Sequence, residues 1–337
     1  MRLTEIDALK LFSESDLLDL AGQADEIRKK KFGKVTTFII DRNINYTNIC
    51  KNECKFCAFF KKKNQAGAYL LTNEEILEKV KETVEAGGTQ VMIQGGLHPD
   101  LGLDYYENML LSIKKNFDIT IHSFTATEIQ HFANTEGISI SETLKRLRAA
   151  GLDGLPGGGA EILVDEIRKK VSPKKIMTDD WLNVMRTAHS IGMKSTATMV
   201  IGFGETPAQR IEHMKKIRDL QDETGGFRAF IMWTYQPGNT ALGGEKTGSH
   251  DYMKTLSLSR IFFDNVEHIQ GSWVTQGEKI GSLTQSFGGD DLGSIMLEEN
   301  VVRAAGTHFE MSVKKMTDMI SDAGFIPAQR NTVYEKI

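Results

Sequence analysis

The sequence predicts an α/β protein, a single (βα)8 TIM-type barrel with a helical extension before it and helices after it. Three observations predict this fold. Runs of β-branched and aromatic residues alternate with segments of helical periodicity from residue 35 to about residue 295. Such alternation indicates parallel strands joined by right-handed helical crossovers. The chain has 337 residues and no low-complexity linker, and a barrel fills about 250 residues before extensions.

The chain begins with a segment, residues 4–31, whose apolar side chains recur at helical spacing. It ends in the basic run 28–31, and Gly33 follows. The helix dipole favours positive side chains in the last turn, so we interpret this run as a solvated helix end rather than a binding patch. Three parts are expected: an N-terminal helical extension, the barrel core and a C-terminal helical segment, over residues 1–34, 35–300 and 301–337.

Seven segments have the composition and length of strands: residues 35–40, 89–94, 119–124, 151–155, 194–201, 227–233 and 269–274. Residues 290–295 are a candidate for an eighth strand. The clearest helix start lies at Thr72, which forms the pattern of a capping box with Glu75. Further helices are expected over residues 105–113, 161–170, 179–191 and 252–263, with two more ending near residues 150 and 223.

The composition excludes some classes of protein. Apolar residues make up 40% of the chain, which is ample for a buried core. With 41 basic and 45 acidic residues the net charge is -4, so a nucleic-acid partner is not expected. The first residues are too charged for a secretory signal, and no apolar run approaches the roughly 20 residues of a membrane helix. A protein without a membrane partner, located in the cytoplasm, is expected.

All three cysteines of the chain, Cys50, Cys54 and Cys57, lie within eight consecutive positions. Thiolates at this spacing suit a soft metal centre, either zinc or an iron–sulfur cluster. Structural zinc needs four ligands, and the nearest downstream histidine is His98. A [4Fe-4S] cluster held by three cysteines would instead leave one iron open to a small molecule. Ligand count therefore favours the cluster, with zinc as the alternative.

Glycine-rich turns follow several predicted strands, at Gly95-Gly96, residues 157–159 and residues 202–204. Glycine allows backbone amides to approach a ligand closely, although each turn could also be ordinary turn punctuation. In barrels of this type the chemistry lies at the carboxyl ends of the strands. Three such turns on the face that also carries the cysteines therefore indicate a ligand site there.

The pattern Cys-x3-Cys-x-aromatic-Cys resembles the signature of the radical S-adenosylmethionine (radical SAM) enzymes. The resemblance implies a radical SAM barrel, a [4Fe-4S] cluster on the three cysteines, and S-adenosylmethionine bound to the open iron as a cosubstrate. Reduction of the cluster would then yield a 5′-deoxyadenosyl radical. The backbone beside Phe56 matches the position that contacts adenine in this superfamily.

Other positions also match cofactor contacts of the superfamily. Gly95 and Gly96 stand where many members have Gly-Gly-Glu, with Leu97 in place of the glutamate. Glu161 matches an acidic residue beyond the fourth strand that contacts S-adenosylmethionine, although it could equally be an acid in the first turn of a helix. Ser123, at the end of the third predicted strand, is a further candidate for cofactor or substrate.

The resemblance extends from about residue 36 to residue 330. Four stretches look like the subgroup of futalosine-pathway enzymes of menaquinone synthesis and deazaflavin (F0) synthases: residues 45–48, 94–100, 155–161 and 221–227. Residues 233–242 and 272–277 favour the dehypoxanthine futalosine cyclases. This resemblance implies dehypoxanthine futalosine as substrate, hydrogen abstraction from C4′ of its ribose, ring closure, and an electron donor such as flavodoxin or ferredoxin.

Three alternatives to this function stay open. The sister aminofutalosine synthases or an F0-synthase-like enzyme would use the same cluster on other substrates. A zinc-bound scaffold protein would carry out no chemistry. A redox relay would pass electrons through the cluster without forming 5′-deoxyadenosine.

Several further side chains lie at predicted strand ends. His98 and His122 could bind or transfer protons, but a hydrogen-bonded structural histidine is the simpler interpretation. His189 is expected to pack in a helix. Trp233 could stack on an aromatic substrate or simply fill the barrel mouth. The substrate carboxylate suggests an arginine or hydroxyl partner, for which Arg228 is a candidate, although its side chain could equally point outward.

Overall fold

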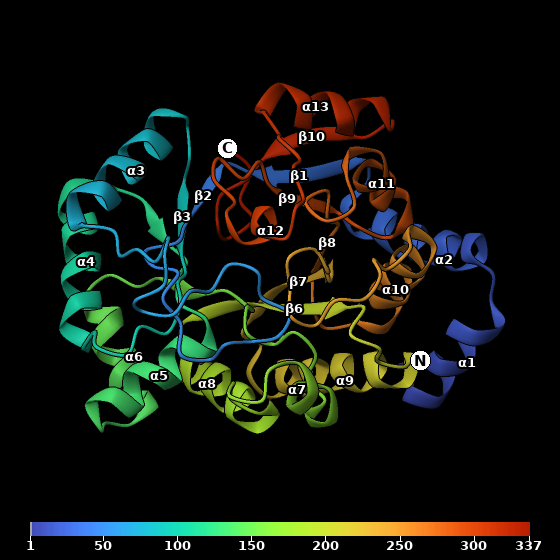
Figure 1. The fold of residues 1–337 in the computed structure, drawn as a ribbon. Helices are drawn as coiled ribbons and strands as arrows, with labels where there is room; N and C mark the ends of the chain where they lie inside the picture. The colour runs from blue at the N-terminus through green and yellow to red at the C-terminus, as the bar shows by residue number, and fades with distance from the viewer. Residues whose placement is uncertain (1) are drawn as a thin grey trace.

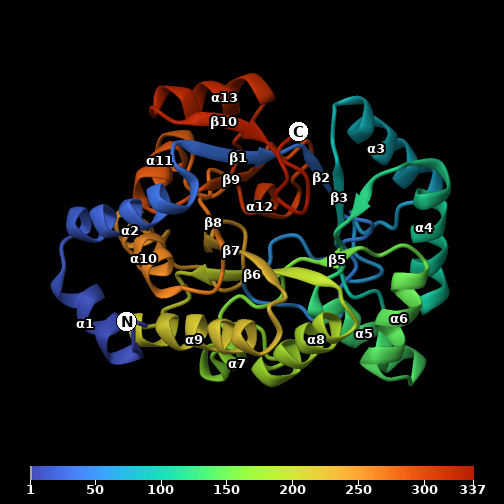
Figure 2. The ribbon, with the colours of Figure 1, turned by 180° about the vertical axis from the view of Figure 1, so that it is seen from behind.

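The computed structural model describes residues 2–337 as parallel strands surrounded by helices (Figure 1). The view from behind shows the same arrangement, with the helices of residues 73–149 along one side of the ring and those of residues 165–224 below it (Figure 2). The strands are β1 (Val35–Ile39), β2 (Asp41–Ile44), β3 (Gln90–Ile93), β4 (Thr120–Ile121), β5 (Gly154–Leu155), β6 (Lys194–Ile201), β7 (Phe227–Thr234), β8 (His268–Gln270), β9 (Asp291–Ser294) and β10 (Ile326–Gln329).

Most of the helices lie on the outside of this ring. The helices are α1 (Glu5–Glu14), α2 (Leu17–Phe32), α3 (Asn73–Glu85), α4 (Leu103–Asn116), α5 (Ala126–Glu136), α6 (Ile140–Ala149), α7 (Asp165–Val171), α8 (Thr178–Ser190), α9 (Pro207–Thr224), α10 (Ser249–Phe262), α11 (Glu278–Leu283), η1 (Thr284–Phe287), α12 (Val301–Ala304) and α13 (Val313–Asp322). Among these helices of residues 2–337, none combines the length and the apolar character needed to cross a membrane.

The strands close into a ring through two junctions. One parallel sheet has the order β10-β1-β9-β8-β7-β6-β5, and a second has the order β2-β3-β4. β1 continues into β2 through Ile40, so one stretch of chain belongs to both sheets. At the other junction the amide of Ser123 donates to the carbonyl of Gly154 at 2.9 Å, and that of Asp153 to Ile121 at 3.0 Å. The predicted (βα)8 barrel is confirmed, and β9 is its eighth strand.

Local sequence explains where many helices begin. Thr72, Thr125 and Thr206 each cap the helix that follows, and each forms a capping box with the side chain three residues later. The main core lies between the strands and this helical layer, where Val91 and Ile93 of β3 and Tyr106 of α4 are fully buried.

The two ends of the chain differ from the prediction. The expected helix 4–31 is divided into α1 and α2, because the side chain of Asp16 accepts a hydrogen bond from the amide of Asp19 and caps a new helix. The C-terminal segment contains α12 and α13 but also β10, which pairs with β1. Pro327 concealed this strand in the sequence, since proline is tolerated only at a sheet edge, and β10 is an edge strand.

Candidate active site

One cavity of about 360 Å³ is lined by residues of the barrel strands and of the loops at their carboxyl ends. Its lining includes all three cysteines and Phe56 from the loop after β2, and Glu161 from the loop after β5. At its other end it reaches Arg330 and Tyr334 in the C-terminal tail. Residues that are far apart in the sequence thus share one enclosed space.

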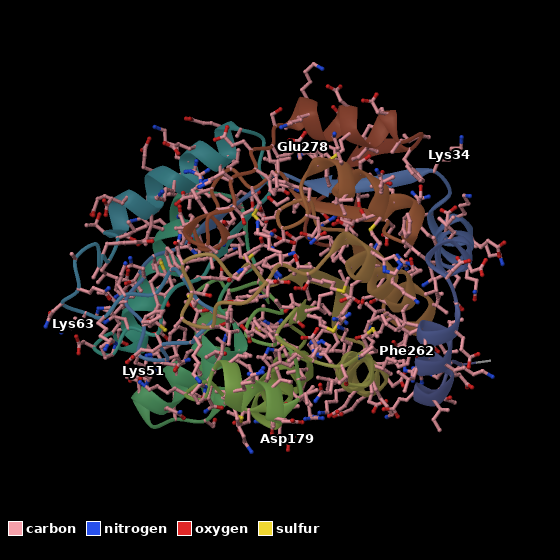
Figure 3. The ribbon with its side chains drawn as sticks, turned by 45° about the vertical axis from the view of Figure 1, so that its right-hand side comes forward. Lys34, Lys51, Lys63, Asp179, Phe262 and Glu278 are labelled. Carbon is pink, nitrogen blue, oxygen red and sulfur yellow. The ribbon has the colours of Figure 1, made fainter. Side chains whose placement is uncertain are left out.

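The cysteine loop is held by backbone hydrogen bonds to three other segments. The amide of Lys51 donates to Leu97 at 3.1 Å, and that of Lys55 donates to Val171 at 2.9 Å. The carbonyl of Lys55 accepts from the amide of Leu242 at 2.8 Å. Figure 3 shows Lys63, farther along this connection, at the outer edge of the molecule. The loop therefore runs from the cavity to the surface, with its cysteine portion anchored.

The three thiols are free and face the same cavity. Burial raises the pKa of Cys54 to about 12, and the neighbouring Cys50 and Cys57 add to this shift. Burial also raises the pKa of Cys57. Thiols kept neutral in this way become ligands when metal charge stabilises the thiolates, so the donor chemistry fits a metal cluster. Within residues 2–337, no three Cys, His, Asp or Glu side chains already form a group set to hold a metal ion.

Glu161 lies next to this loop, but not in a helix. It has a φ of 41° in the connection after β5, and α7 begins only at Asp165, so the expectation of a helix over 161–170 is wrong for its first residues. The carbonyl of Glu161 accepts from the amide of Val200 at 2.7 Å, which anchors this strained turn to β6. From this turn Glu161 lines the cavity.

A buried ion pair forms beside the cysteines. Lys175 Nζ lies 2.6 Å from Glu161 Oε1 and 5.5 Å from the centroid of the Phe56 ring. Burial alone would lower the pKa of Lys175, but the attraction of Glu161 and Cys54 together outweighs burial, and the pKa is raised. Glu161 Oε2 is buried without a hydrogen-bond partner among residues 2–337, and Arg168 Nη1 is 3.8 Å away. A ligand with a donor group could satisfy this oxygen.

Gly95 and Gly96 line the cavity and also pack against the cysteine loop. A Cβ on Gly95 would lie 2.6 Å from the ring of Tyr46. A Cβ on Gly96 would lie 2.2 Å from the carbonyl oxygen of Ile49 and 2.9 Å from Cβ of Cys50. The absence of side chains here is therefore required by close packing, and it leaves the backbone exposed to the cavity.

The other predicted site residues divide into two groups. His122 lines the cavity, as do Trp233 and Arg228. Ser123 is fully buried, and its hydroxyl accepts a hydrogen bond from the amide of Ile93 at 2.9 Å; it is not among the residues that line the cavity. His189 packs in a helix as expected, between Thr224 and Ser195. His98 also lies outside the lining.

Two residues at the site were missed by sequence reasoning. Lys175 belongs to a lysine pair that looks like solvated surface, yet Lys174 reaches outward to Glu53 while the Lys175 side chain is only 12% exposed. Glu128 looks like the acid of an ordinary capping box. In the fold its carboxylate also accepts from the Tyr46 hydroxyl and from the amide of Gly95, both at 3.0 Å. Only long-range contacts reveal either role.

Comparison with known proteins identifies the family. Residues 44–217 match the family model of the radical SAM superfamily, and residues 224–337 match that of the CofH/MqnC C-terminal region. Among solved structures, the [FeFe]-hydrogenase maturase HydG from Carboxydothermus hydrogenoformans has a similar fold. Its TM-score is 0.79 at 19% identity, over 99% of this chain and 77% of that chain.

Full-length relatives give a closer assignment. The cyclic dehypoxanthine futalosine synthase of Streptomyces coelicolor is 46% identical over 100% of this chain and 86% of its own length. The synthase of Halalkalibacterium halodurans is 45% identical over 100% of this chain and 92% of its own. A 5-amino-6-(D-ribitylamino)uracil--L-tyrosine 4-hydroxyphenyl transferase of Methanosarcina acetivorans is 40% identical, over 100% and 91%. The chain is thus a radical SAM enzyme and belongs to the family of the cyclic dehypoxanthine futalosine synthases.

Proposed function

We propose that this protein converts dehypoxanthine futalosine to cyclic dehypoxanthinylfutalosinate in menaquinone biosynthesis. The observation that carries the proposal is the similarity over the whole chain to two synthases of this name, at 46% and 45% identity. Similarity to the transferase that acts on tyrosine is lower, at 40%. A cavity of about 360 Å³ inside the barrel supports the proposal, since binding sites for small molecules have volumes of roughly 300–1,000 Å³.

The proposed reaction closes one carbon–carbon bond. A hydrogen atom leaves C4′ of the ribose, and that carbon adds to the carboxyphenyl ring. One electron and one proton then leave the ring, which restores its aromaticity, so the product is lighter than the substrate by two hydrogens. The protein holds the two carbons together and excludes water from the radical.

We propose that Cys50, Cys54 and Cys57 hold a [4Fe-4S] cluster, because three thiols from one anchored loop face the cavity. When bound, the cluster and S-adenosylmethionine supply the radical that abstracts hydrogen. Residues next to the cysteines are proposed to contact the cosubstrate: Phe56, Gly95, Gly96 and Glu161. Ser123 is proposed to support β3 from behind, because its hydroxyl already accepts a hydrogen bond from the amide of Ile93. The backbone carbonyls of the glycines and the free oxygen of Glu161 suit the cosubstrate's amino group.

An electron donor is needed to reduce the cluster, and we propose a small redox protein such as flavodoxin or ferredoxin. A cytoplasmic location is proposed because three free thiols and a reduced cluster need a reducing compartment. The division into residues 1–34, 35–300 and 301–337 is likewise proposed. Arg330 and Tyr334 line the cavity, so the last segment would serve the barrel rather than act separately.

Anaerobic reconstitution tests this function. The protein is loaded with iron and sulfide, then incubated with S-adenosylmethionine, dehypoxanthine futalosine and dithionite, and the products are measured by mass spectrometry. We expect 5′-deoxyadenosine together with a product lighter by two hydrogens. Cys54→Ala should form neither, whereas Lys51→Ala, which removes an exposed side chain from the same loop, should behave as wild type.

Other outcomes would identify the alternatives. Zinc in place of iron and sulfide would indicate a scaffold protein. Reversible reduction without 5′-deoxyadenosine would indicate a redox relay. Turnover of the aminofutalosine synthase substrate, with release of carbon dioxide, would indicate that sister enzyme.

A further inference from the structure

A guanidinium without a partner lies at the inner end of the cavity. We use the name cavity floor for His122, Arg228, Arg330 and Tyr334, which all line this end. Arg228 Nη1 is buried and has no hydrogen-bond partner among residues 2–337. Burial lowers the pKa of Arg228, as expected for a charge removed from water. An unpaired buried charge is costly, so this arrangement indicates an anion that is supplied from outside the chain.

The other charges near Arg228 are already paired or of the same sign. Asp153, a carboxylate near Arg228, pairs with Lys114 Nζ at 2.7 Å. Arg330 forms a two-pronged ion pair with Asp291, with Nε–Oδ2 at 2.5 Å and Nη2–Oδ1 at 3.0 Å. Asp41, the other carboxyl group near Arg330, accepts hydrogen bonds from Gln90 and Ser294, and burial raises its pKa. The cavity floor therefore has an excess positive charge that belongs to Arg228.

A break in strand register explains why Arg228 faces the cavity. β6 and β7 pair Ser195 with Phe227 but Ala197 with Phe230, so β7 has one extra residue between these pairs. Without that bulge, Arg228 would share the outward face with Phe230, which packs against the ring of Phe263 in the helical layer. With it, Arg228 lines the cavity together with Ile231 and Trp233. Bulges commonly redirect a side chain beside an active site.

His122 provides a second unsatisfied group at the same place. It is 4% exposed, and its Nδ1 has no hydrogen-bond partner among residues 2–337. A Cβ on Gly154 would lie 3.1 Å from His122 Nδ1 and 3.4 Å from Arg228 Nη1, so this glycine leaves room for both. Burial lowers the pKa of His122 to about 3, and the charge of Arg228 adds to the shift. A neutral imidazole can donate one hydrogen bond without adding charge.

We propose that Arg228 and His122 bind the aryl carboxylate of the substrate at the cavity floor. The inference rests on the proposed function, in which the substrate carries a carboxyphenyl group. A planar guanidinium matches a carboxylate with two parallel hydrogen bonds. Thr234, the last residue of β7, lies six positions after Arg228, which corresponds to about 20 Å of strand at ~3.3 Å per residue. An elongated substrate anchored at this depth would hold its ribose toward the cysteines, and its aryl ring beneath.

The test compares variants and substrates by steady-state kinetics of the reconstituted enzyme. Arg228→Met should raise the KM for dehypoxanthine futalosine by roughly 30-fold or more, because it removes one partner of a buried charge pair. Arg228→Lys should recover part of this loss. The wild type should have a KM for the carboxamide analogue that is as high as the KM of Arg228→Met for the substrate itself. The surface control Arg186→Met removes an equal charge from a side chain that is 44% exposed, and should keep the wild-type KM.

The inference would be overturned if Arg228→Met had the KM of the wild type, or if the wild type turned over the acid and the carboxamide equally well. Either result would leave the proposed function standing. Iron and sulfide content after reconstitution, compared between Arg228→Met and the Arg186→Met control, separates a loss of substrate binding from a general defect in folding or cluster loading. Should Arg228→Met not fold, the carboxamide comparison on the wild type still decides. Calorimetric binding of the substrate that depends on Arg228, without any cyclic product, would instead refute the proposed function and leave this binding site standing.

Discussion

At the residue scale, the close approach of two backbones explains the need for glycine beside the cysteines. The amide of Gly96 donates to the carbonyl of Thr47 at 2.9 Å, and its carbonyl accepts from the Tyr46 hydroxyl. Any side chain at this position would meet the carbonyl of Ile49, which is fixed backbone and cannot rotate away. The position of the cysteine loop therefore depends on this glycine.

Gly96→Ala should displace the cysteine loop. The added Cβ would lie 2.2 Å from the Ile49 oxygen, and overpacking of this kind costs about 1–3 kcal/mol of stability. We expect a lower free energy of unfolding in urea and less iron bound per chain after reconstitution. The control is Gly22→Ala within α2, where a Cβ would meet nothing within 4 Å. That variant should gain about 0.5–1 kcal/mol, and its iron content should be normal. Full iron loading of Gly96→Ala would contradict this account.

Sequence reasoning located the site where its residues are contiguous and missed it where they are not. The cysteines and Phe56 could be predicted because spacing within one loop carries the information. Lys175 could not, since a lysine beside Lys174 differs from it only through the carboxylate that the fold brings near. Glu161 lines the same cavity as the cysteines, but the turn that holds it was expected to be the start of a helix. A positive φ in a glutamate is set by its packing against β6, which no local pattern records.

At the element scale, the strands contribute most to the site at their irregularities. The bulge in β7 turns Arg228 inward, and a single extra residue cannot be recognised in a run of apolar side chains. β8 ends at Gln270, although the sequence predicted a strand as far as residue 274. There the amide of Ser272 leaves the sheet and donates to the Tyr252 hydroxyl at 2.8 Å, a tertiary contact that overrides β propensity.

The C-terminal tail closes the inner end of the barrel, and Tyr334 is its key contact. The Tyr334 ring stacks on His268 with centroids 3.7 Å apart, and Arg330 lies 3.8 Å above the ring. Tyr334→Ala should lower the free energy of unfolding by about 2 kcal/mol and raise the substrate KM, because Arg330 loses its support. Tyr334→Phe keeps the ring and should change both values little. Equal behaviour of the two variants in urea unfolding and kinetics would argue against a supporting role.

At the scale of the whole molecule, the barrel was predictable because each unit of strand and helix has its own local period. The absence of a low-complexity linker also favoured a single barrel. Closure of the ring was harder to predict from the sequence. It depends on β1 and β2 sharing one stretch of chain and on the hydrogen bond from Ser123 to Gly154. The cavity floor depends on the last residues of the chain, which return to β1 after some 290 residues.

Three buried histidines at separate places in the barrel should make the stability of the protein depend on pH. Burial lowers the pKa of His122 and His213 to about 3 and that of His189 to about 4. They stay neutral in the folded state, whereas in the unfolded chain they gain protons below about pH 6.5. The unfolded state thus binds more protons, so stability is lost as the pH falls below that value. As the pH falls below about 6.5, each histidine should lower the free energy of unfolding by about 1.4 kcal/mol per pH unit. The three together should lower it by about 4 kcal/mol at pH 5.5.

Urea unfolding of the protein at pH 7.5 and pH 5.5 measures this loss, and His189→Gln isolates one histidine. The variant removes a titrating group between Thr224 and Ser195, so its loss of stability over this range should be smaller than that of wild type by about 1.4 kcal/mol. Thr224→Val removes a hydrogen-bond partner but keeps the imidazole. It should be less stable at both pH values and show the wild-type difference between them. An unchanged pH dependence in His189→Gln would mean that this histidine takes up its proton over the same pH range in the folded protein as in the unfolded chain.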